Sequence, residues 1–286
     1  MPELPDLSYI VSRLAPQIAG RRIMDIKVKE PIVIRVLVQD AGGFVGALTG
    51  QTFQGLDRRG PFLRFSLGDR ELVMHCMLAG RLQVAGARDK ALPGTCLSFF
   101  LDDGARLSYA DEKKMGKVYL TVPGAYDTIP GFREQGIDIL GPDFTFEAFD
   151  RLIQGRRHQA RVFIMDQAAL SAIGNAYADE ILFDARIHPK TSCASLSPEE
   201  RRTLYDSIRK VMEWGITEVE KADQPIEVKV RDHVKVRNRN GQPCPVCGTT
   251  IRRVGVLGYD SFYCPRCQPA TRKQFIPWHE ERTPDA

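Results

Sequence analysis

Four cysteines near the end of the chain have the spacing of a zinc ligand set. They follow the pattern Cys-x2-Cys-x16-Cys-x2-Cys, and they are Cys244, Cys247, Cys264 and Cys267. Two closely spaced pairs around an insert of hairpin length can close a tetrahedron of thiolates around one Zn²⁺. Because four thiolates fill the coordination sphere, the predicted zinc is structural and has no open position for water or substrate. Any catalytic chemistry must therefore use other residues.

The charge around these cysteines suggests what the zinc module contacts. Between Lys229 and Lys273 the chain has ten basic and two acidic residues, a net charge near +8 in a protein whose total is +4. A basic face on a small zinc fold is typical of a surface that meets a phosphate backbone. An ordinary solvated face is the simpler alternative.

The amino terminus supplies the second group that could react. The chain begins Met1-Pro2-Glu3, and removal of Met1 exposes the secondary amine of Pro2. An α-amino group has a pKa of about 7.7 to 8.0 in model peptides, so part of it is neutral and nucleophilic near neutral pH. Such an amine can attack an electrophilic sugar carbon and form an iminium ion, with Glu3 beside it to move protons. If Met1 is retained, the same nitrogen is an inert amide.

Length and composition limit the class of protein. With 286 residues, 43% of them hydrophobic, the chain can bury a substantial core in two or three domains. It has no apolar run near the ~18 to 20 residues of a membrane span and no signal region at its start, so we expect a soluble, cytoplasmic protein. The other cysteines, Cys76, Cys96 and Cys193, are scattered and odd in number, which favours reduced, buried thiols.

The elements that must position these groups fall into segments. Pro5 and Asp6 indicate the start of a first helix. From about residue 20 to 120, short runs rich in Val, Ile, Leu and Phe alternate with Gly, Pro and Asp, which predicts an all-β sandwich or barrel within a first domain, residues 1–130. The clearest predicted strands are residues 32–37, 62–67, 71–77 and 96–101. The first helix is expected to bury Leu7, Ile10, Val11, Leu14 and Ile18.

Beyond the first domain the apolar spacing becomes helical, which predicts a second domain at residues 131–228 and a zinc-bearing third at 229–286. Ser197 and Glu200 form a capping box with Pro198 at the first helical position. Asn175 stands at the start of another predicted helix, and amide groups at a helix start can bind phosphate. The helix after Ser197 is expected to bury Leu204, Ile208, Val211 and Met212.

Several short stretches, taken in order, resemble one known family. Each is weak alone, but their order and spacing are specific. They are Pro2-Glu3-Leu4-Pro5, Arg58-Arg59-Gly60 followed by Phe62-Leu63, residues 74–80, residues 173–180 with Ile187-His188-Pro189, and the finger ending at residues 262–267. Over nearly its full length the chain resembles the formamidopyrimidine-DNA glycosylase and endonuclease VIII family of base-excision repair enzymes.

The resemblance implies an α+β fold with an N-terminal β-sandwich, a helix-two-turn-helix domain and a zinc finger with a β-hairpin. It implies a monomer that acts on damaged double-stranded DNA as a bifunctional glycosylase and AP lyase. Such an enzyme excises oxidised bases through a Schiff base on its N-terminal proline and cuts the strand by β- and δ-elimination. A stacked base is inaccessible, so the nucleotide must first be extruded from the duplex.

The resemblance also assigns roles to residues of this chain. Pro2 is the implied nucleophile, and Glu3 the implied acid and base that helps to open the sugar. Residues from two loops are implied to fill the gap left by the extruded nucleotide, because apolar wedges such as methionine suit unstacked DNA. These residues are Met77, Lys113 and Met115. Contacts with the DNA backbone are implied for Asn175, for Arg161 at a position where the family usually has lysine, and for position 259.

The chain departs from the family at three further positions. Pro61 replaces a lysine that contacts phosphate and supports catalysis, so that function is lost or moved to Arg58, Arg59 or Arg64. Tyr259 replaces an arginine, and a phenol cannot form a bidentate ionic contact. Asp6 replaces a glutamate and is one methylene shorter.

These departures leave two alternatives open. The first is a homologue that binds abasic or distorted DNA without excising bases, which Pro61 and Tyr259 favour and the Pro2-Glu3 pair opposes. The second is a protein that uses its zinc module for contacts with partners other than nucleic acid, which the basic segment argues against. His75, in an apolar run, is interpreted as a structural histidine. We find no motif around residues 210 to 228, where the conformation of a loop is expected to decide the preference for one lesion over another.

Overall fold

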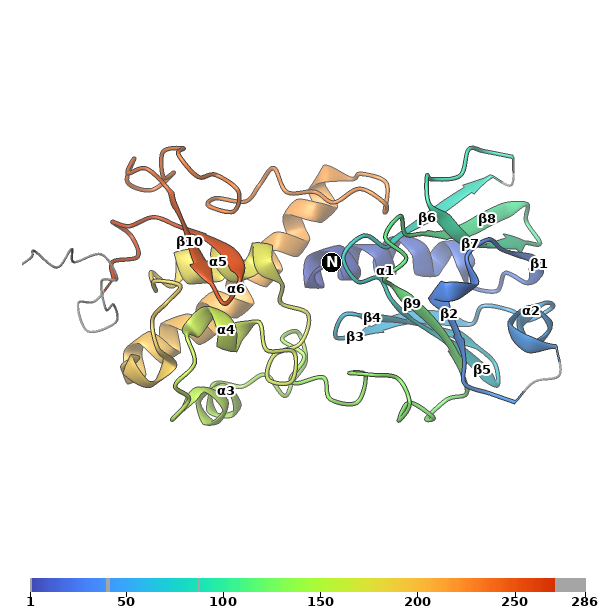
Figure 1. The fold of residues 1–286 in the computed structure, drawn as a ribbon, viewed down its shortest axis with the longest axis horizontal. Helices are drawn as coiled ribbons and strands as arrows, with labels where there is room; N and C mark the ends of the chain where they lie inside the picture. The colour runs from blue at the N-terminus through green and yellow to red at the C-terminus, as the bar shows by residue number, and fades with distance from the viewer. Residues whose placement is uncertain (1, 40–41, 87, 271–286) are drawn as a thin grey trace, which may run out of the picture. The chain divides into compact units, whose positions relative to one another are not determined.

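The computed structural model describes residues 2–39, 42–86 and 88–270, which divide into two compact units (Figure 1). The first unit comprises residues 2–143 together with Asp166–Gly174 and Met212–His233. The second comprises Phe144–Met165, Asn175–Val211 and residues 234–270. Each unit thus gathers segments that are far apart in the sequence.

The first unit contains two mainly antiparallel sheets. One has the strand order β1-β7-β8-β6, and the other has the order β2-β9-β5-β4-β3, in which only the β2–β9 pair is parallel. The strands are β1 (Ile23–Val28), β2 (Ile34–Val36), β3 (Gly55–Arg59), β4 (Phe62–Leu67), β5 (Arg70–His75), β6 (Arg81–Gly86), β7 (Thr95–Leu101), β8 (Ala105–Ala110) and β9 (Lys117–Thr121). This is the predicted β-sandwich.

Aromatic side chains join the two sheets. Phe53 contacts Phe65 of β4, with ring centroids 5.9 Å apart, and Phe99 of β7, at 6.0 Å. All three rings are buried. Phe44, on the short helix α2 (Gly43–Leu48), packs on Phe99 from the side. Burial of large rings between two pleated faces is the main stabilising term of such a sandwich.

Helix α1 (Leu4–Ile18) packs on β3. Its predicted stripe is buried at Leu7, Ile10, Leu14 and Ile18, whereas Val11 is only partly buried because it lies at the margin of the stripe. The predicted strand at residues 32–37 begins later than expected, because Pro31 starts a 3-10 turn (Pro31–Val33) before β2. The strand predicted at 71–77 ends at His75, since the backbone of Met77 has a φ of 47°.

The second unit is helical at its centre. An aromatic cluster of Phe144, Phe149, Phe163 and Tyr205 fills it, with neighbouring ring centroids 4.8 to 6.2 Å apart. Ser197 and Glu200 form the predicted capping box, with hydrogen bonds of 2.7 and 3.1 Å. The helices are α3 (Phe146–Ile153), α4 (Ala160–Ile164), α5 (Asn175–Asp184) and α6 (Pro198–Ala222), whose last residues belong to the first unit. The loop expected around residues 210 to 228 is therefore helix as far as Ala222, because the apolar stripe of α6 continues to the buried Val219.

The zinc finger completes the second unit. Strands β10 (Arg252–Val256) and β11 (Tyr259–Tyr263) form a hairpin that packs on α5. Both residues of its turn have positive φ, 45° at Leu257 and 80° at Gly258, which matches the right-handed twist of a two-residue hairpin. Within the described ranges, no helix is long and apolar enough to cross a membrane.

Candidate functional site

Glu3 is held from two directions at the start of α1. Its side chain is only 5% exposed, and its carboxylate Oε2 accepts a hydrogen bond of 3.2 Å from the amide of Gly174. Its own amide donates to Asp6 Oδ2 at 2.8 Å, as part of a capping box. A buried carboxylate bonded to backbone amides has a fixed position, which a group that moves protons needs.

Gly174 is essential to this arrangement for a steric reason. A Cβ on this residue would lie 2.6 Å from Cδ of Glu3, closer than real contacts allow. The chain approaches the same place through Ala172, whose carbonyl accepts the amide of Leu4 at 2.9 Å. In the sequence Gly174 stands only as part of a motif, and no local pattern indicates its contact with Glu3.

Asp6 is the partner of a distant arginine. Arg231 donates to both carboxylate oxygens of Asp6, at 2.8 and 2.6 Å, and the Asp6 side chain is 7% exposed. A bidentate pair of this kind is among the strongest charge-assisted contacts. The shorter carboxylate at position 6 therefore links Arg231 to the amide of Glu3.

Pro2 is buried and lines a narrow pocket in the first unit. The pocket is bounded by Asp6 and Tyr9 of α1, by Cys76 and by Lys229, among others. Met1, whose removal the chemistry requires, lies outside the described residues. Burial raises the pKa of the Cys76 thiol to about 12, so this cysteine is a neutral packing residue. Together with Cys96 and Cys193, it is buried and unpaired, as the sequence analysis predicted.

The loop of Met77 projects from the end of β5. Met77 is partly exposed, and Leu78 beside it is 52% exposed. The amide of Met77 donates to Nδ1 of His75 at 3.3 Å, while burial lowers the pKa of His75 to about 4. His75 is therefore a neutral acceptor that holds the loop. The Nζ of Lys229 adds a second contact, with the carbonyl of Leu78 at 3.2 Å.

The loop of Lys113 and Met115 is organised by a buried carboxylate that the sequence analysis missed. Asp111 is fully buried and accepts the amides of Lys113 and Gly116, at 3.0 and 2.7 Å, and the hydroxyl of Tyr109 at 3.3 Å. Met115 is 41% exposed at the outer side of this loop. The signal was present in the sequence, because an aspartate at the head of a Gly-containing loop commonly binds the amides that follow it.

Pro61 lies buried in the turn between β3 and β4. Beside it Gly60 has a φ of 53°, and a Cβ there would meet Oε1 of Gln135 at 2.2 Å. Of the three arginines considered as replacements, Arg58 pairs with Asp138 at 2.9 Å and Arg64 pairs with Asp57 at 2.6 Å. The hydrogen bond and charge of Asp57 raise the pKa of Arg64.

Arg59 differs from the other two arginines. It is exposed, and it donates to the carbonyls of Phe132 and Arg133, at 2.9 and 3.4 Å. Carbonyls do not neutralise its charge. Arg59 is therefore the arginine of this group best suited to meet an anion.

Asn175 begins α5, and a buried arginine fixes its side chain. Arg161 Nη2 donates to Asn175 Oδ1 at 2.7 Å, and Arg161 Nε donates to Asp179 at 3.2 Å. Arg161 is only 1% exposed, whereas Tyr259 is 58% exposed. The expected direct contact of Arg161 with phosphate does not fit this burial, because Asp179 and Asn175 already hold the guanidinium inside the protein. Arg161 instead orients Asn175.

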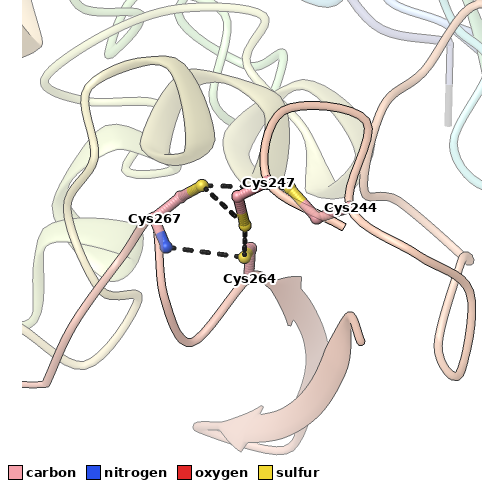
Figure 2. A group of neighbouring side chains, drawn as sticks. All are labelled: Cys244, Cys247, Cys264 and Cys267. Atoms are coloured by element: carbon pink, nitrogen blue, oxygen red, sulfur yellow. Dashed lines mark hydrogen bonds between the residues drawn. The ribbon is translucent and has the colours of Figure 1, made fainter. Parts of the chain in front are cut away.

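The four predicted cysteines converge as a zinc site requires (Figure 2). Their sulfur atoms lie within 4.8 Å of one another, with 3.5 Å from Cys247 to both Cys264 and Cys267, and 3.8 Å from Cys244 to Cys267. A tetrahedral site with Zn–S distances of about 2.3 Å has sulfur–sulfur edges of about 3.8 Å. The cluster fits one zinc ion with four protein ligands, and the protein binds one structural zinc here.

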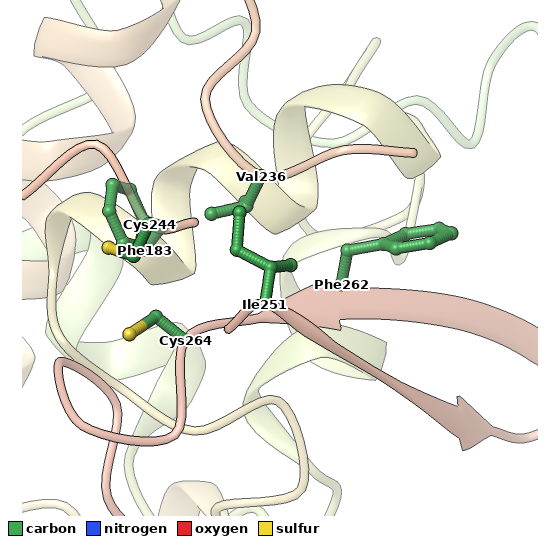
Figure 3. Packing of buried hydrophobic residues seen from close by; sticks show 6 residues of the cluster. All are labelled: Phe183, Val236, Cys244, Ile251, Phe262 and Cys264. Carbon is green, nitrogen blue, oxygen red and sulfur yellow. The ribbon is translucent and has the colours of Figure 1, made fainter. Parts of the chain in front are cut away.

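The finger has little core apart from these ligands. Cys244 and Cys264 belong to a small buried cluster with Phe183 of α5, Phe262 of β11 and Ile251, and Val236 completes it (Figure 3). So small a core rarely folds without a metal. The cysteines thus join the hairpin to α5.

Parts of the basic segment are neutralised within the protein. Arg231 pairs with Asp6 and Arg237 with Asp179, two carboxylates outside the segment that its net charge of +8 does not include. Arg253 pairs with Asp260 at 3.2 Å, a carboxylate that this net charge already includes. Arg272 and Lys273 lie outside the described residues. The positive charge available to a partner is therefore smaller than the count from the sequence.

Three family models match successive parts of the chain. The formamidopyrimidine-DNA glycosylase N-terminal domain matches residues 1–118, and the formamidopyrimidine-DNA glycosylase H2TH domain matches residues 136–224. A zinc finger found in FPG and IleRS matches residues 241–270.

Similar proteins extend these matches to whole chains. A formamidopyrimidine-DNA glycosylase from Symbiobacterium thermophilum is 36% identical over 275 residues, which cover 94% of this chain and 90% of the relative. Another, from Geobacillus kaustophilus, is 34% identical and covers 94% of this chain and 100% of the relative. The solved complex between the Lactococcus lactis Fpg and DNA containing an abasic site has a TM-score of 0.84 at 25% identity, covering 94% and 100% of the two chains.

A likeness over this much of the chain, with the zinc cluster in place, defines a DNA glycosylase of base-excision repair. The chain belongs to the formamidopyrimidine-DNA glycosylase family, of which AP lyase activity is expected as well.

Proposed function

We propose that this protein excises oxidised bases from double-stranded DNA and then cuts the strand, with Pro2 as nucleophile and Glu3 as acid and base. The observation that carries the proposal is the fixed position of the Glu3 carboxylate, which is buried beside Pro2 and bonded to Gly174. An immobile carboxylate next to a potential secondary amine is the arrangement that iminium chemistry on a sugar requires.

The reaction has a defined balance of bonds and protons. The lone pair of the neutral Pro2 amine attacks C1′, and the bond between C1′ and the base breaks with its electron pair leaving on the base. The N–H proton of Pro2 passes to the Glu3 carboxylate, and the expelled base takes a proton from water. Glu3 then delivers its proton to the ring oxygen, which opens the sugar and leaves an iminium ion. Loss of a C2′ proton then expels the 3′-phosphate, and a second elimination expels the 5′-phosphate. Water hydrolyses the iminium ion and returns the free amine.

Related proteins support a proposal for the substrate class. Similar solved structures hold DNA with Fapy-dG, an oxidised pyrimidine or carbocyclic 8-oxo-G, with TM-scores of 0.84. We infer that this enzyme accepts oxidised purines and pyrimidines in duplex DNA. We also infer that it acts as a monomer in the bacterial cytoplasm, on the nucleoid.

Two exposed loops are proposed to stabilise the duplex after extrusion. Met77, on the loop held by His75, and Met115, on the loop held by Asp111, are the proposed wedges, with Lys113 beside them. Asn175 and Tyr259 are proposed to contact a backbone phosphate, with Arg161 in support of Asn175. The domain division at residues 130 and 228 is retained as a proposal for the sandwich, the helical domain and the finger.

A second candidate is a protein that binds damaged DNA without excising bases. The observation in its favour is Pro61, which is buried in its turn and carries no charge at the position where the family resemblance implies a lysine. Such a protein keeps affinity for abasic or distorted DNA but forms no covalent intermediate.

Borohydride trapping separates these candidates. Wild-type protein is incubated with duplexes that carry an oxidised purine, an oxidised pyrimidine or an abasic site, and borohydride reduces any iminium ion to a stable adduct. If the protein is a glycosylase, wild type forms adducts with the duplexes that carry an oxidised purine or pyrimidine, and Pro2→Gly forms none. Adducts with the abasic duplex alone indicate a lyase without glycosylase activity. Tight binding with no adduct at all supports the second candidate.

The state of the amino terminus is tested separately. Mass spectrometry of active protein purified from cells is expected to show loss of Met1. Active protein that keeps Met1 contradicts the assignment of Pro2, since its nitrogen is then an amide.

A further inference from the structure

We propose that Arg237 supplies the phosphate-binding guanidinium that position 259 lacks in this chain. The proposal rests on the proposed function, because it assumes that Asn175 and Tyr259 face the DNA backbone. In the sequence Arg237 is only one of the ten basic residues between Lys229 and Lys273.

The guanidinium of Arg237 contacts Asn175 and the residue next to Tyr259. Its Nη1 donates to the carbonyl of Asn175 at 3.4 Å and to the carbonyl of Asp260, the neighbour of Tyr259, at 2.9 Å. Its Cζ lies 5.1 Å from the centroid of the Phe262 ring, so the aromatic face supports the guanidinium. All of these residues belong to the second unit.

Arg237 retains unused donors. Its three hydrogen bonds all come from Nη1, the third being a bond of 2.8 Å with Asp179 Oδ2. Its Nε and Nη2 make no hydrogen bond with any residue in the described part of the chain, and the side chain is 19% exposed. Two N–H groups on one edge of a guanidinium suit two oxygens of a phosphate.

The surrounding charges leave Arg237 able to bind an anion. Asp179 is fully buried and bonds Arg161 through one oxygen and Arg237 through the other, so a single carboxylate serves two arginines. The carboxylate of Glu180 accepts the backbone amides of residues 235, 236 and 237 and contacts neither guanidinium in the described structure. Glu180 therefore fixes the backbone that carries Arg237.

The two arginines have different roles for a geometric reason. Arg161 is 1% exposed, and it bonds Asn175, Asp179 and the carbonyl of Asp260. Arg237 bonds the same three residues, at the carbonyls of Asn175 and Asp260 and at the other oxygen of Asp179, but lies nearer the solvent. Arg161 is thus the buried support, and Arg237 is the side chain that can reach a phosphate.

The test measures binding to a duplex with a tetrahydrofuran abasic analogue, by fluorescence anisotropy across a range of salt concentrations. Arg237→Gln keeps a donor for Asp179 but removes the charge. It is expected to weaken binding about 10- to 100-fold and to lower the slope of log K against log salt by about one. Arg237→Lys is expected to keep the slope with weaker binding, because lysine cannot bridge two oxygens.

Matched variants distinguish a specific contact of Arg237 with phosphate from the general effect of positive charge on DNA binding. Arg252→Gln removes an exposed arginine of the same finger and is expected to change affinity less than about threefold. Introducing Tyr259→Arg into Arg237→Gln is expected to restore binding, because both positions then address the same phosphate. Equal losses in Arg237→Gln and Arg252→Gln would overturn the proposal, and so would wild-type affinity and slope in Arg237→Gln.

A phosphate scan gives a readout that a purely structural role does not produce. Single phosphates of the duplex are replaced with neutral methylphosphonates. At one phosphate this replacement is expected to weaken binding by the wild type but not binding by Arg237→Gln. If Arg237→Gln loses its zinc, Arg237→Met, which keeps the apolar stem but carries no charge, takes its place in the scan, and a full wild-type response to that phosphate refutes the contact. Binding is measured independently of trapping, so a wild type that binds but forms no adduct disproves the glycosylase activity and leaves this inference testable.

Discussion

Arg231 donates hydrogen bonds to both carboxylate oxygens of Asp6, at 2.8 and 2.6 Å, although the two residues are 225 positions apart in the sequence. The same carboxylate accepts the amide of Glu3 at 2.8 Å. A residue near the end of the first unit thus fixes the backbone that carries both Pro2 and Glu3. Arg231 is a positioning residue, because it acts on the reacting groups only through Asp6.

Arg231→Ala is expected to slow the reaction without abolishing DNA binding. The variant leaves the buried Asp6 without its cation and frees the start of α1, and small displacements of reacting groups can cost about 100-fold in rate. We expect the single-turnover rate of base excision to fall about 10- to 100-fold. Arg231→Lys keeps the charge but makes one contact, so its rate should lie between those of wild type and Arg231→Ala. Equal rates for wild type and Arg231→Ala contradict this role.

Gly174→Ala is expected to displace the carboxylate of Glu3. The added Cβ lies 2.6 Å from Cδ of Glu3, so the side chain must move away from the amide that holds it. We expect a loss of about 100-fold in single-turnover rate with affinity for the abasic analogue nearly unchanged. The control is Gly255→Ala in the finger, where a Cβ meets nothing within 4 Å. An active Gly174→Ala enzyme would show that Glu3 tolerates other positions.

Local patterns in the sequence predicted the elements well where the cause was itself local. The capping box at Ser197 and Glu200 and the cysteine spacing depend on residues close in sequence or on fixed ligand geometry. The start of β2 differed from its prediction because Pro31 imposes a turn, which was visible in the sequence but was given too little weight.

Local sequence patterns could not predict contacts between segments that are distant in the sequence. Nothing in the sequence pairs Arg231 with Asp6 or places Gly174 against Glu3. Arg161 shows the consequence most clearly. Its charge suggested a surface contact with phosphate, but the fold buries it against Asp179, because a carboxylate in the core needs a cation.

His188 is expected to make stability fall as the pH falls. Its side chain is 2% exposed, and burial, with a smaller effect of Lys190, lowers its pKa from 6.5 to about 4. Between these values the unfolded chain takes up a proton that the folded chain does not, so unfolding becomes easier. The loss of unfolding free energy that His188 causes is absent above pH 6.5, grows to roughly 2 to 3 kcal/mol by pH 4 and then stays constant.

Urea denaturation of wild type and His188→Gln at several pH values measures this effect. The difference in unfolding free energy between the two proteins should change from pH 6.5 to pH 4 and stay constant above pH 6.5. His158, which is exposed, provides the matched control as His158→Gln. A constant difference between wild type and His188→Gln through the whole window contradicts a neutral His188 in the folded protein.

Removal of zinc is expected to unfold the finger while the sandwich stays folded. Cys244 and Cys264 are both ligands and members of the small cluster with Phe183 and Phe262, so the metal and the core of the finger are lost together. Cys264→Ser should bind less than one zinc per chain and lose most affinity for the abasic analogue, with the β-sheet circular dichroism of the first unit retained. Cys193→Ser replaces a cysteine that is equally buried but is no ligand, and it should keep its zinc and its affinity. Zinc content unchanged in Cys264→Ser, measured by atomic absorption, refutes the four-cysteine site, because three thiolates and a water do not make a closed structural centre.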